Sequence, residues 1–184
     1  NVAVTVSGTV SAADANTITG ATLGTVTATV AAGTAASLNA TLKNANASGT
    51  DALTLKVTGT TAAAADLIAL DGKTSVAVDA SLVTLITGSA ADVKAVLAAS
   101  GIDTAGNVAV TVSGTVSAAD ANTIAGATTG KVTATVAADE AATLNTALGN
   151  ATSTDALTLK VTGTTATAAD LIALNAKTSV KVKV

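Results

Sequence analysis

The stretch TVTATV, residues 25–30, alternates strictly between apolar and polar side chains. In an extended chain Val26, Ala28 and Val30 lie on one side, and the intervening threonines lie on the other. This period of two predicts a β-strand with one covered face and one face open to solvent. The segments VAVTVS (2–7) and LTLKVT (53–58) repeat the pattern, so such strands recur along the chain.

The sequence also repeats on a longer scale. Residues 1–18 return unchanged as residues 107–124, which divides the chain into a first large unit, 1–106, and a second, truncated unit, 107–184. Within these units the alternating segments are spaced mostly 23 to 27 residues apart, a spacing typical of solenoid proteins. They begin near Val2, Val26, Leu53, Val76, Val108, Val132, Leu157 and Val180.

Between the predicted strands lie Ala- and Leu-rich segments with apolar residues at helical spacing, such as SAADANTI (11–18) and AAAADLIAL (62–70). Several begin with Ser or Thr three positions before Asp, which predicts a capping interaction at a helix N-terminus. We interpret these aspartates as capping residues rather than as metal ligands or general acids. The pairs are Ser11 and Asp14, Ser89 and Asp92, Ser117 and Asp120, and Thr167 and Asp170.

Alternation of strand and helix predicts parallel pairing through right-handed crossovers. In a doubly wound sheet both faces are covered and strands are continuously apolar, whereas here every second residue is polar or small. We therefore predict a two-layer right-handed α/β solenoid with a parallel sheet, helices on one face, and a leucine-rich-repeat-like layout. The first large unit would hold four strand–helix coils, and the whole chain would be one continuous solenoid.

Two local expectations accompany this fold. The connection after Val76 is longer than the others and is expected to bulge outward on the helical side. Glycines follow four predicted strands, where the chain must turn sharply out of the sheet. They are Gly8, Gly59, Gly114 and Gly163.

Composition excludes several classes of function. The chain of 184 residues is 49% hydrophobic and 11% charged, which predicts a folded protein with a core of small aliphatic side chains. A net charge of −3 without any aromatic residue argues against a nucleic-acid partner. No apolar run is long enough for a membrane span.

The residue types needed for catalysis are also scarce. Without His or Cys, a nucleophilic site would need Lys or a carboxylate as base, and a metal site would need a cage of carboxylates. Asp71, Asp79 and Asp103 are the few acids outside helix starts, and we interpret them as solvated surface groups. The sequence predicts no enzymatic activity, no catalytic or metal-binding residues, and no cofactor.

Three segments resemble the low-complexity repeats of very large secreted and cell-surface proteins of cyanobacteria, including surface proteins linked to swimming motility. These are VSAADANTI (10–18), TAAAADLIALDGKTSVAVDAS (61–81) and LITGSAADVKAVLAASGI (85–102). The resemblance implies an extracellular or cell-surface location and a structural or adhesive function. Some relatives carry calcium-binding repeats of the type GGxGxD, and this chain contains none.

Two functions remain open. In the first, the chain is a stiff structural or adhesive repeat segment of an extracellular surface or matrix protein. In the second, the open threonine-rich face binds polysaccharide or ice, although Lys56, Lys131 and Lys160 interrupt it. The residues predicted for such a face are Thr5, Thr27, Thr29, Thr58, Thr111, Thr133, Thr135 and Thr162.

The ends of the predicted sheet bear on partners. The strands at Val2 and Val180 would each leave an unpaired edge, and such an edge invites addition of another copy. The sequence therefore predicts head-to-tail association with further copies into filaments, or cover by neighbouring repeats. Lys181 and Lys183 near the last strand are typical of edge protection.

Overall fold

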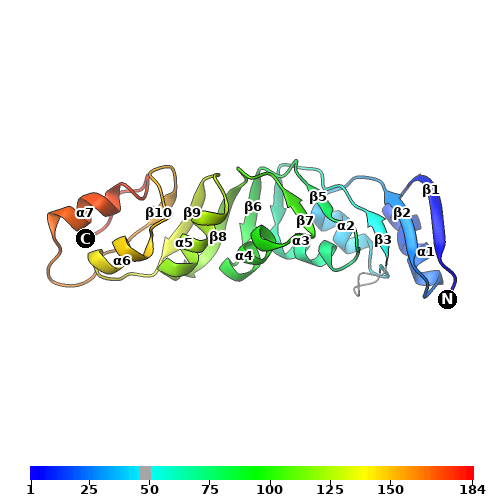
Figure 1. Cartoon of the computed structure of the whole chain (residues 1–184), viewed down its shortest axis with the longest axis horizontal. Coiled ribbons are helices and arrows are strands. Elements are labelled where there is room, and N and C mark those ends of the chain that lie inside the picture. The colour runs from blue at the N-terminus through cyan, green and yellow to red at the C-terminus, as the bar shows by residue number, and fades with distance from the viewer. Residues whose placement is uncertain (46–50) are drawn as a thin grey trace. The chain divides into compact units, whose positions relative to one another are not determined.

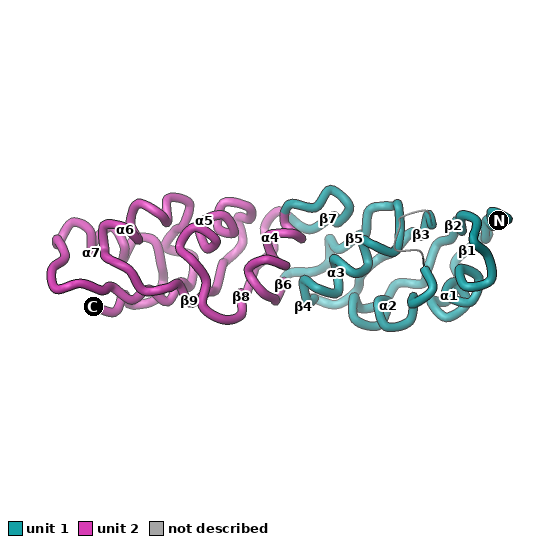
Figure 2. The backbone as a smooth tube through the Cα atoms, turned by 90° about the horizontal axis from the view of Figure 1, so that it is seen from below, with its two compact units in different colours: residues 1–84, 98–105 teal, residues 85–97, 106–184 magenta. Residues whose placement is uncertain are grey.

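The computed structural model describes residues 1–45 and 51–184 (Figure 1). These fall into two compact units: unit 1 comprises residues 1–84 and 98–105, and unit 2 comprises residues 85–97 and 106–184 (Figure 2). The fold is mixed α/β with parallel sheets, as the alternation of strand and helix predicted. The strands are β1 (Val4–Val10), β2 (Val26–Val30), β3 (Ala52–Thr54), β4 (Thr61–Ala63), β5 (Val78–Ala80), β6 (Leu85–Gly88), β7 (Ile102–Thr104), β8 (Ala109–Val116), β9 (Val132–Val136) and β10 (Ala156–Thr158). The helices are α1 (Ala12–Ala21), α2 (Ala35–Thr41), α3 (Ala64–Asp71), α4 (Ala90–Ala98), α5 (Ala118–Ala127), α6 (Ala141–Ala147) and α7 (Ala168–Asn175).

Every strand pairing described within the two units is parallel. In unit 1, β1, β2 and β3 are neighbours in that order, and β5 pairs separately with β7. In unit 2 the order is β10, β9, β8 and β6. Register partners are 22 positions apart for Thr5 and Thr27 and 25 apart for Thr27 and Ala52.

Burial along the strands follows the predicted alternation. In β2, Val26, Ala28 and Val30 are buried while Thr27 and Thr29 are exposed, and β9 shows nearly the same pattern. Helix α1 packs against β2 and helix α5 against β9, so the apolar face of each strand meets a helix. The core consists of Leu, Ile, Val and Ala, because the sequence offers no larger apolar side chain.

All four predicted capping interactions form. The Ser11 hydroxyl accepts a hydrogen bond from the Asp14 amide at 3.1 Å and donates one to the Asp14 carboxylate at 2.7 Å. The same reciprocal pair occurs at Ser89 and Asp92, at Ser117 and Asp120, and at Thr167 and Asp170. These aspartates therefore act at the positive end of a helix dipole.

The four predicted turn glycines all have positive φ, but two lie elsewhere than expected. Gly59 and Gly163 follow strand-like segments, with φ of 93° and 95°. Gly8 and Gly114, with φ of 77° and 74°, lie inside β1 and β8. There the register shifts, so that Thr5 and Thr9 oppose Thr27 and Thr29. The extra residues form a bulge, which left-handed glycine permits.

Two other expectations were wrong in detail. The connection after Val76 does not continue as helix alone, because residues 85–88 form the additional strand β6 before α4. The expected strand at Val180 is reduced to an isolated bridge between Lys160 and Lys183. Residues 180–184 thus lie at an edge without becoming a full strand.

Candidate functional site

Threonines form rows across the open face of the unit 1 sheet. Thr5 lies opposite Thr27, and Thr9 opposite Thr29, which in turn lies opposite Thr54. The side chains in each row come from adjacent strands, about 4.8 Å apart. All five are exposed. Unit 1 therefore presents hydroxyl and methyl groups at a regular spacing.

Unit 2 carries the same arrangement. Thr87 on β6, Thr111 on β8 and Thr133 on β9 are register partners in sequence, and Ala156 ends that row. A second row joins Thr115 and Thr135 to Thr158 on β10. Three of the residues predicted for the face, Thr111, Thr133 and Thr135, thus lie in these rows, as Thr5, Thr27 and Thr29 do in unit 1.

The two remaining predicted face residues lie outside the strands. The backbone of Thr58 bonds to Gly33 and that of Thr162 to Asp139, beyond β3 and β10. Sequence reasoning in turn left five row members out of the predicted face. The glycine bulge could have revealed Thr9 and Thr115, because it returns them to the face on which Thr5 and Thr111 lie. The five are Thr9, Thr54, Thr87, Thr115 and Thr158.

Charged groups lie on the same side of unit 1. Asp79 on β5 is the register partner of Asp103 on β7 and forms an ion pair with Lys56, with 3.0 Å between Nζ and Oδ2. The Ser81 hydroxyl donates to Asp79 at 2.5 Å. The Ser81 hydroxyl first, and then the Lys56 ammonium, lower the pKa of Asp79 to about 2. Asp79 is therefore fully ionised at neutral pH and is poorly suited to act as a general acid or base.

Acid titration should report on this carboxylate. Since the folded-state pKa of Asp79 is about 2 against an ordinary value of 3.8, its contribution to stability is present above pH 3.8 and is lost as the pH falls through about 2. We expect Ser81→Ala to raise the pKa of Asp79 towards 3.8, measured by NMR titration of the side-chain carboxyl. Lys56→Gln is the comparison, with a smaller expected increase. A carboxyl that titrates at 3.8 in the unmodified protein would contradict the assignment.

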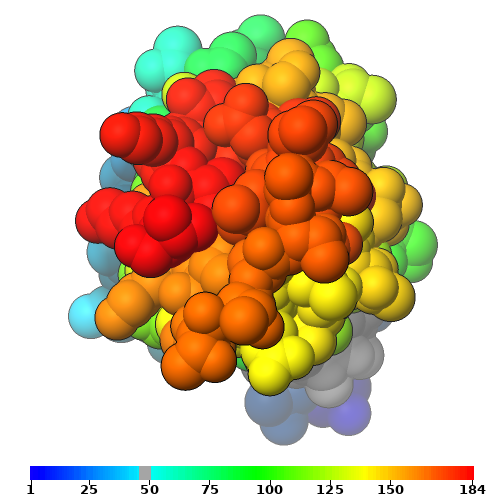
Figure 3. Space-filling model, turned by 90° about the vertical axis from the view of Figure 1, so that its left-hand side faces the viewer, coloured from blue at the N-terminus to red at the C-terminus, as the bar shows by residue number. Residues whose placement is uncertain are grey.

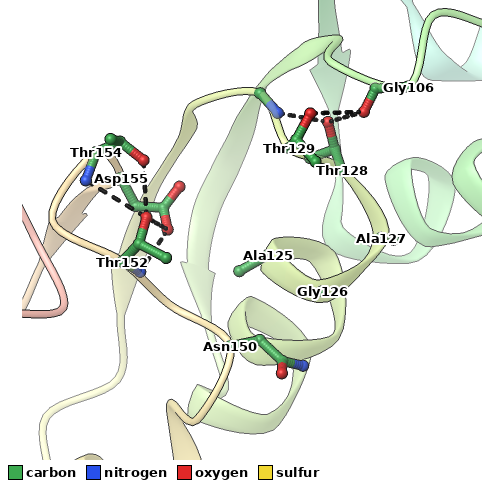
Figure 4. A pocket seen from close by; sticks show the side chains of 11 residues that line it. Gly106, Ala125, Gly126, Ala127, Thr128, Thr129, Asn150, Thr152, Thr154 and Asp155 are labelled. Atoms are coloured by element: carbon green, nitrogen blue, oxygen red, sulfur yellow. Dashed lines mark hydrogen bonds between the residues drawn. The ribbon is translucent and has the colours of Figure 1, made fainter.

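The largest hollow in unit 2 is a polar cleft with a volume of about 590 Å³, between the α5–β9 loop and the loop that precedes β10 (Figure 4). Asn150 closes one end, since its backbone N–H donates to the Asn122 side chain at 2.6 Å. Gly126 is required beside it, because a Cβ there would lie 2.5 Å from the Asn150 amide nitrogen. The cleft is lined by Gly106, residues 125–130, Asn150, Thr152, Thr154 and Asp155.

Asp155 is the one carboxylate in this cleft, and it is 4% exposed. Its Oδ1 accepts from the Val132 amide at 2.9 Å, and its Oδ2 accepts from the Thr152 amide at 2.9 Å. Asp51 accepts from the Val26 amide in the same way in unit 1. These carboxylates tie the start of one strand to the next segment and face backbone N–H groups. Among the residues the structure describes, no three acidic side chains gather where a metal ion could bind.

A threonine clamp recurs between neighbouring strands. The Thr128 hydroxyl donates to the Val108 carbonyl at 2.7 Å and accepts from the Gly130 amide at 2.9 Å. Equivalent hydroxyls donate to the carbonyl of the preceding strand segment and accept an amide two residues ahead. They belong to Thr22, Thr74 and Thr178. Sequence reasoning missed the clamp, although threonine recurs at the start of TLGT (22–25), TSVA (74–77), TTGK (128–131) and TSVK (178–181).

Replacing Thr128 by Val is expected to lower the free energy of unfolding by about 2 kcal/mol, because the isosteric side chain leaves a buried N–H and C=O without their partner. Urea denaturation followed by circular dichroism measures the change. Thr115→Val is the matched control, since its hydroxyl faces solvent, and it should change stability by less than about 0.5 kcal/mol. Equal losses in both variants would contradict a clamping role.

Comparison with known proteins adds no relative. No family model matches the sequence, and neither a curated protein nor a solved structure is significantly similar to it. None of the helices in the described parts of the chain has the length and apolar character needed to cross a membrane.

Proposed function

We propose that the chain is a structural or adhesive repeat segment of an extracellular surface or matrix protein, in which each unit is a two-layer right-handed α/β solenoid acting as a stiff scaffold. The observation that carries this proposal is the recurrent clamp. Thr22, Thr74, Thr128 and Thr178 make the same pair of hydrogen bonds between successive strands. Its most conspicuous polar device therefore joins neighbouring repeats.

The way in which polar groups are engaged supports a scaffold. In the described residues, no buried side-chain nitrogen or oxygen lacks a hydrogen-bond partner. Asp51 and Asp155 hold strand amides, and the capping aspartates hold helix ends. In repeat architectures of this type, stability is the sum of each repeat and its contact with the next. A chain built in this way resists extension along its length and needs no ligand.

Single-molecule force spectroscopy tests the scaffold function. The chain is attached to a handle at each end and extended, and unfolding should occur in steps at forces well above those that stretch an unfolded polypeptide. Thr128→Val and Thr178→Val should lower the force of the steps, while Thr115→Val leaves it unchanged. Extension of the unmodified chain at the low forces typical of an unfolded chain would contradict the proposal.

The threonine rows favour a second candidate function, binding of polysaccharide or ice by the open sheet face. Thr5 and Thr9 opposite Thr27 and Thr29 form a two-by-two array of hydroxyl and methyl groups. Glycan-array binding and thermal hysteresis of the purified chain test this function. Thr27→Leu with Thr133→Leu should abolish either signal, and Ala142→Leu on the exposed side of α6 is the control. No signal in the unmodified chain would leave the scaffold function alone.

A further inference from the structure

The two identical segments of the chain differ in burial. Residues 1–18 and 107–124 have the same sequence, yet Val2 is 71% exposed and Val108 only 1%. Ile18 is half-buried, whereas Ile124 is completely buried. Since the side chains are the same, the difference comes from what covers each segment. The surface formed by β1 and α1 in unit 1 thus has the apolar character of an internal contact, and we call it the β1–α1 face.

In unit 2 the equivalent surface is covered by the strand–helix pair β6–α4. Strand β6 lies parallel to β8, with Ile86 opposite Val110 and Thr87 opposite Thr111. The Lys94 ammonium on α4 forms an ion pair with Asp120 on α5. These contacts show which partner the segment accepts: a strand with threonine in the row, followed at once by a capped helix with a cation at its fifth residue.

On the β1–α1 face of unit 1 the corresponding place is open. A cavity of about 560 Å³ lies there, lined mainly by apolar side chains that include Val2, Val4, Ile18 and Leu23. Leu23 is 86% exposed. The backbone of Val4 bonds inward, its N–H donating to the Thr25 carbonyl at 2.9 Å. Because alternate residues of a strand turn their backbone groups to opposite edges, the N–H and C=O of Thr5 face outward.

The other end of the sequence offers a matching strand–helix pair. Residues 164–167 lead directly into α7, whose cap, Thr167 with Asp170, is the counterpart of Ser89 with Asp92 at α4. Figure 3 looks onto this end of unit 2, with α7 and residues 176–184 at the surface. Ile172 on α7 is 72% exposed. Residues 165–167 form no strand, although their repeat counterparts, residues 61–63, form β4.

We infer that the chain binds a second copy of itself head to tail, with residues 164–175 of one copy covering the β1–α1 face of the next as β6–α4 covers β8–α5. Aligned through the helix caps, Thr165 takes the place of Thr87 and lies opposite Thr5. The threonine row of unit 2 thereby has its counterpart across the contact. This inference deepens the proposed scaffold function, because it names the partner as another copy of the scaffold.

The one charge in this contact differs between the template and the ends. Asp14 occupies the position of Asp120, but Ile172 occupies that of Lys94. Placing a lysine at position 172 should therefore restore an ion pair with Asp14 of the next copy. A glutamate there should face Asp14 with the same sign of charge. Position 172 thus separates this register from nonspecific apolar association, which a lysine would weaken.

Sedimentation velocity over a concentration series tests the inference. We expect weight-average mass to rise with concentration, Ile172→Lys to tighten association about threefold at low salt, and Ile172→Glu to weaken it more than about tenfold. Ala142→Lys is the charge-matched control and should leave association unchanged. An unmodified chain that stays monomeric throughout, or an Ile172→Lys variant that associates more weakly, would overturn the inference.

A mixing experiment tests the polarity of the contact. Thr5→Pro removes the outward N–H of β1 and blocks the β1–α1 face, while Ile172→Glu blocks the α7 end. Each variant alone should be monomeric, and an equimolar mixture should form dimers and no larger species. Thr5→Val keeps the N–H and should associate like the unmodified chain. A mixture that stays monomeric would overturn the inference yet leave the force-spectroscopy result for the scaffold function untouched.

Discussion

Replacing Ile124 by alanine is expected to lower the free energy of unfolding by about 3 kcal/mol. The side chain is completely buried on α5, and its removal leaves a cavity among aliphatic neighbours that have no larger group to fill it. Urea denaturation with linear extrapolation measures the loss. Because small aliphatic cores of this kind rely on many thin contacts, the cost should come from lost contact area as well as from transfer to water.

Ile18→Ala is the matched control, since it makes the same change within the same eighteen-residue sequence. Ile18 is half-buried on α1, so its truncation should cost only about 1 kcal/mol at low protein concentration. Local helix propensity is identical in the two segments and cancels in the comparison. Equal losses at the two positions would show that the difference in burial does not exist in solution.

Replacing Gly130 by alanine is the second large effect, with an expected loss of about 3 kcal/mol. A Cβ at this position would overlap the backbone of Asn107 and Val108, which cannot move aside as a flexible side chain can. The strand segment would have to shift, and the Thr128 hydrogen bonds to Val108 and Gly130 would lengthen with it. Thermal and urea denaturation should both register the loss.

Gly114→Ala provides the contrast. Gly114 has a φ of 74°, and a Cβ there would meet no atom within 4 Å. Its cost is therefore the left-handed backbone alone, about 1 kcal/mol. If Gly114→Ala were the more damaging of the two, backbone conformation would outweigh close approach in this fold, contrary to the geometry at Gly130.

Features that depend on neighbours in sequence could be predicted from the sequence. The alternation in TVTATV placed Val26 inside and Thr27 outside, and the structure agrees. The Ser11 and Asp14 pair was expected to cap a helix and does so. Both rest on local chemistry: the period of two of an extended chain, and the reach of a short side chain across one helical turn.

Features that depend on distant partners could not be predicted. Thr128 looks like any polar loop residue until Val108 lies beside it, and Asp155 looks like a turn residue until the Val132 amide bonds to it. The register shift at Gly8 is equally non-local, because it exists only relative to β2. For this reason the predicted face contained Thr58 and Thr162, while Thr54 and Thr158 hold places in the rows.

The identity of residues 1–18 and 107–124 also has a consequence for how the polypeptide reaches its native state. An unfolded chain contains two equivalent competitors for the free edge of β9, and only one of them gives the native connectivity. Synthesis from the N-terminus resolves the competition, since the first segment can dock on β2 before the second has left the ribosome. Dilution from denaturant offers no such order, so swapped isomers are expected among the refolded molecules and should be rare in nascent protein.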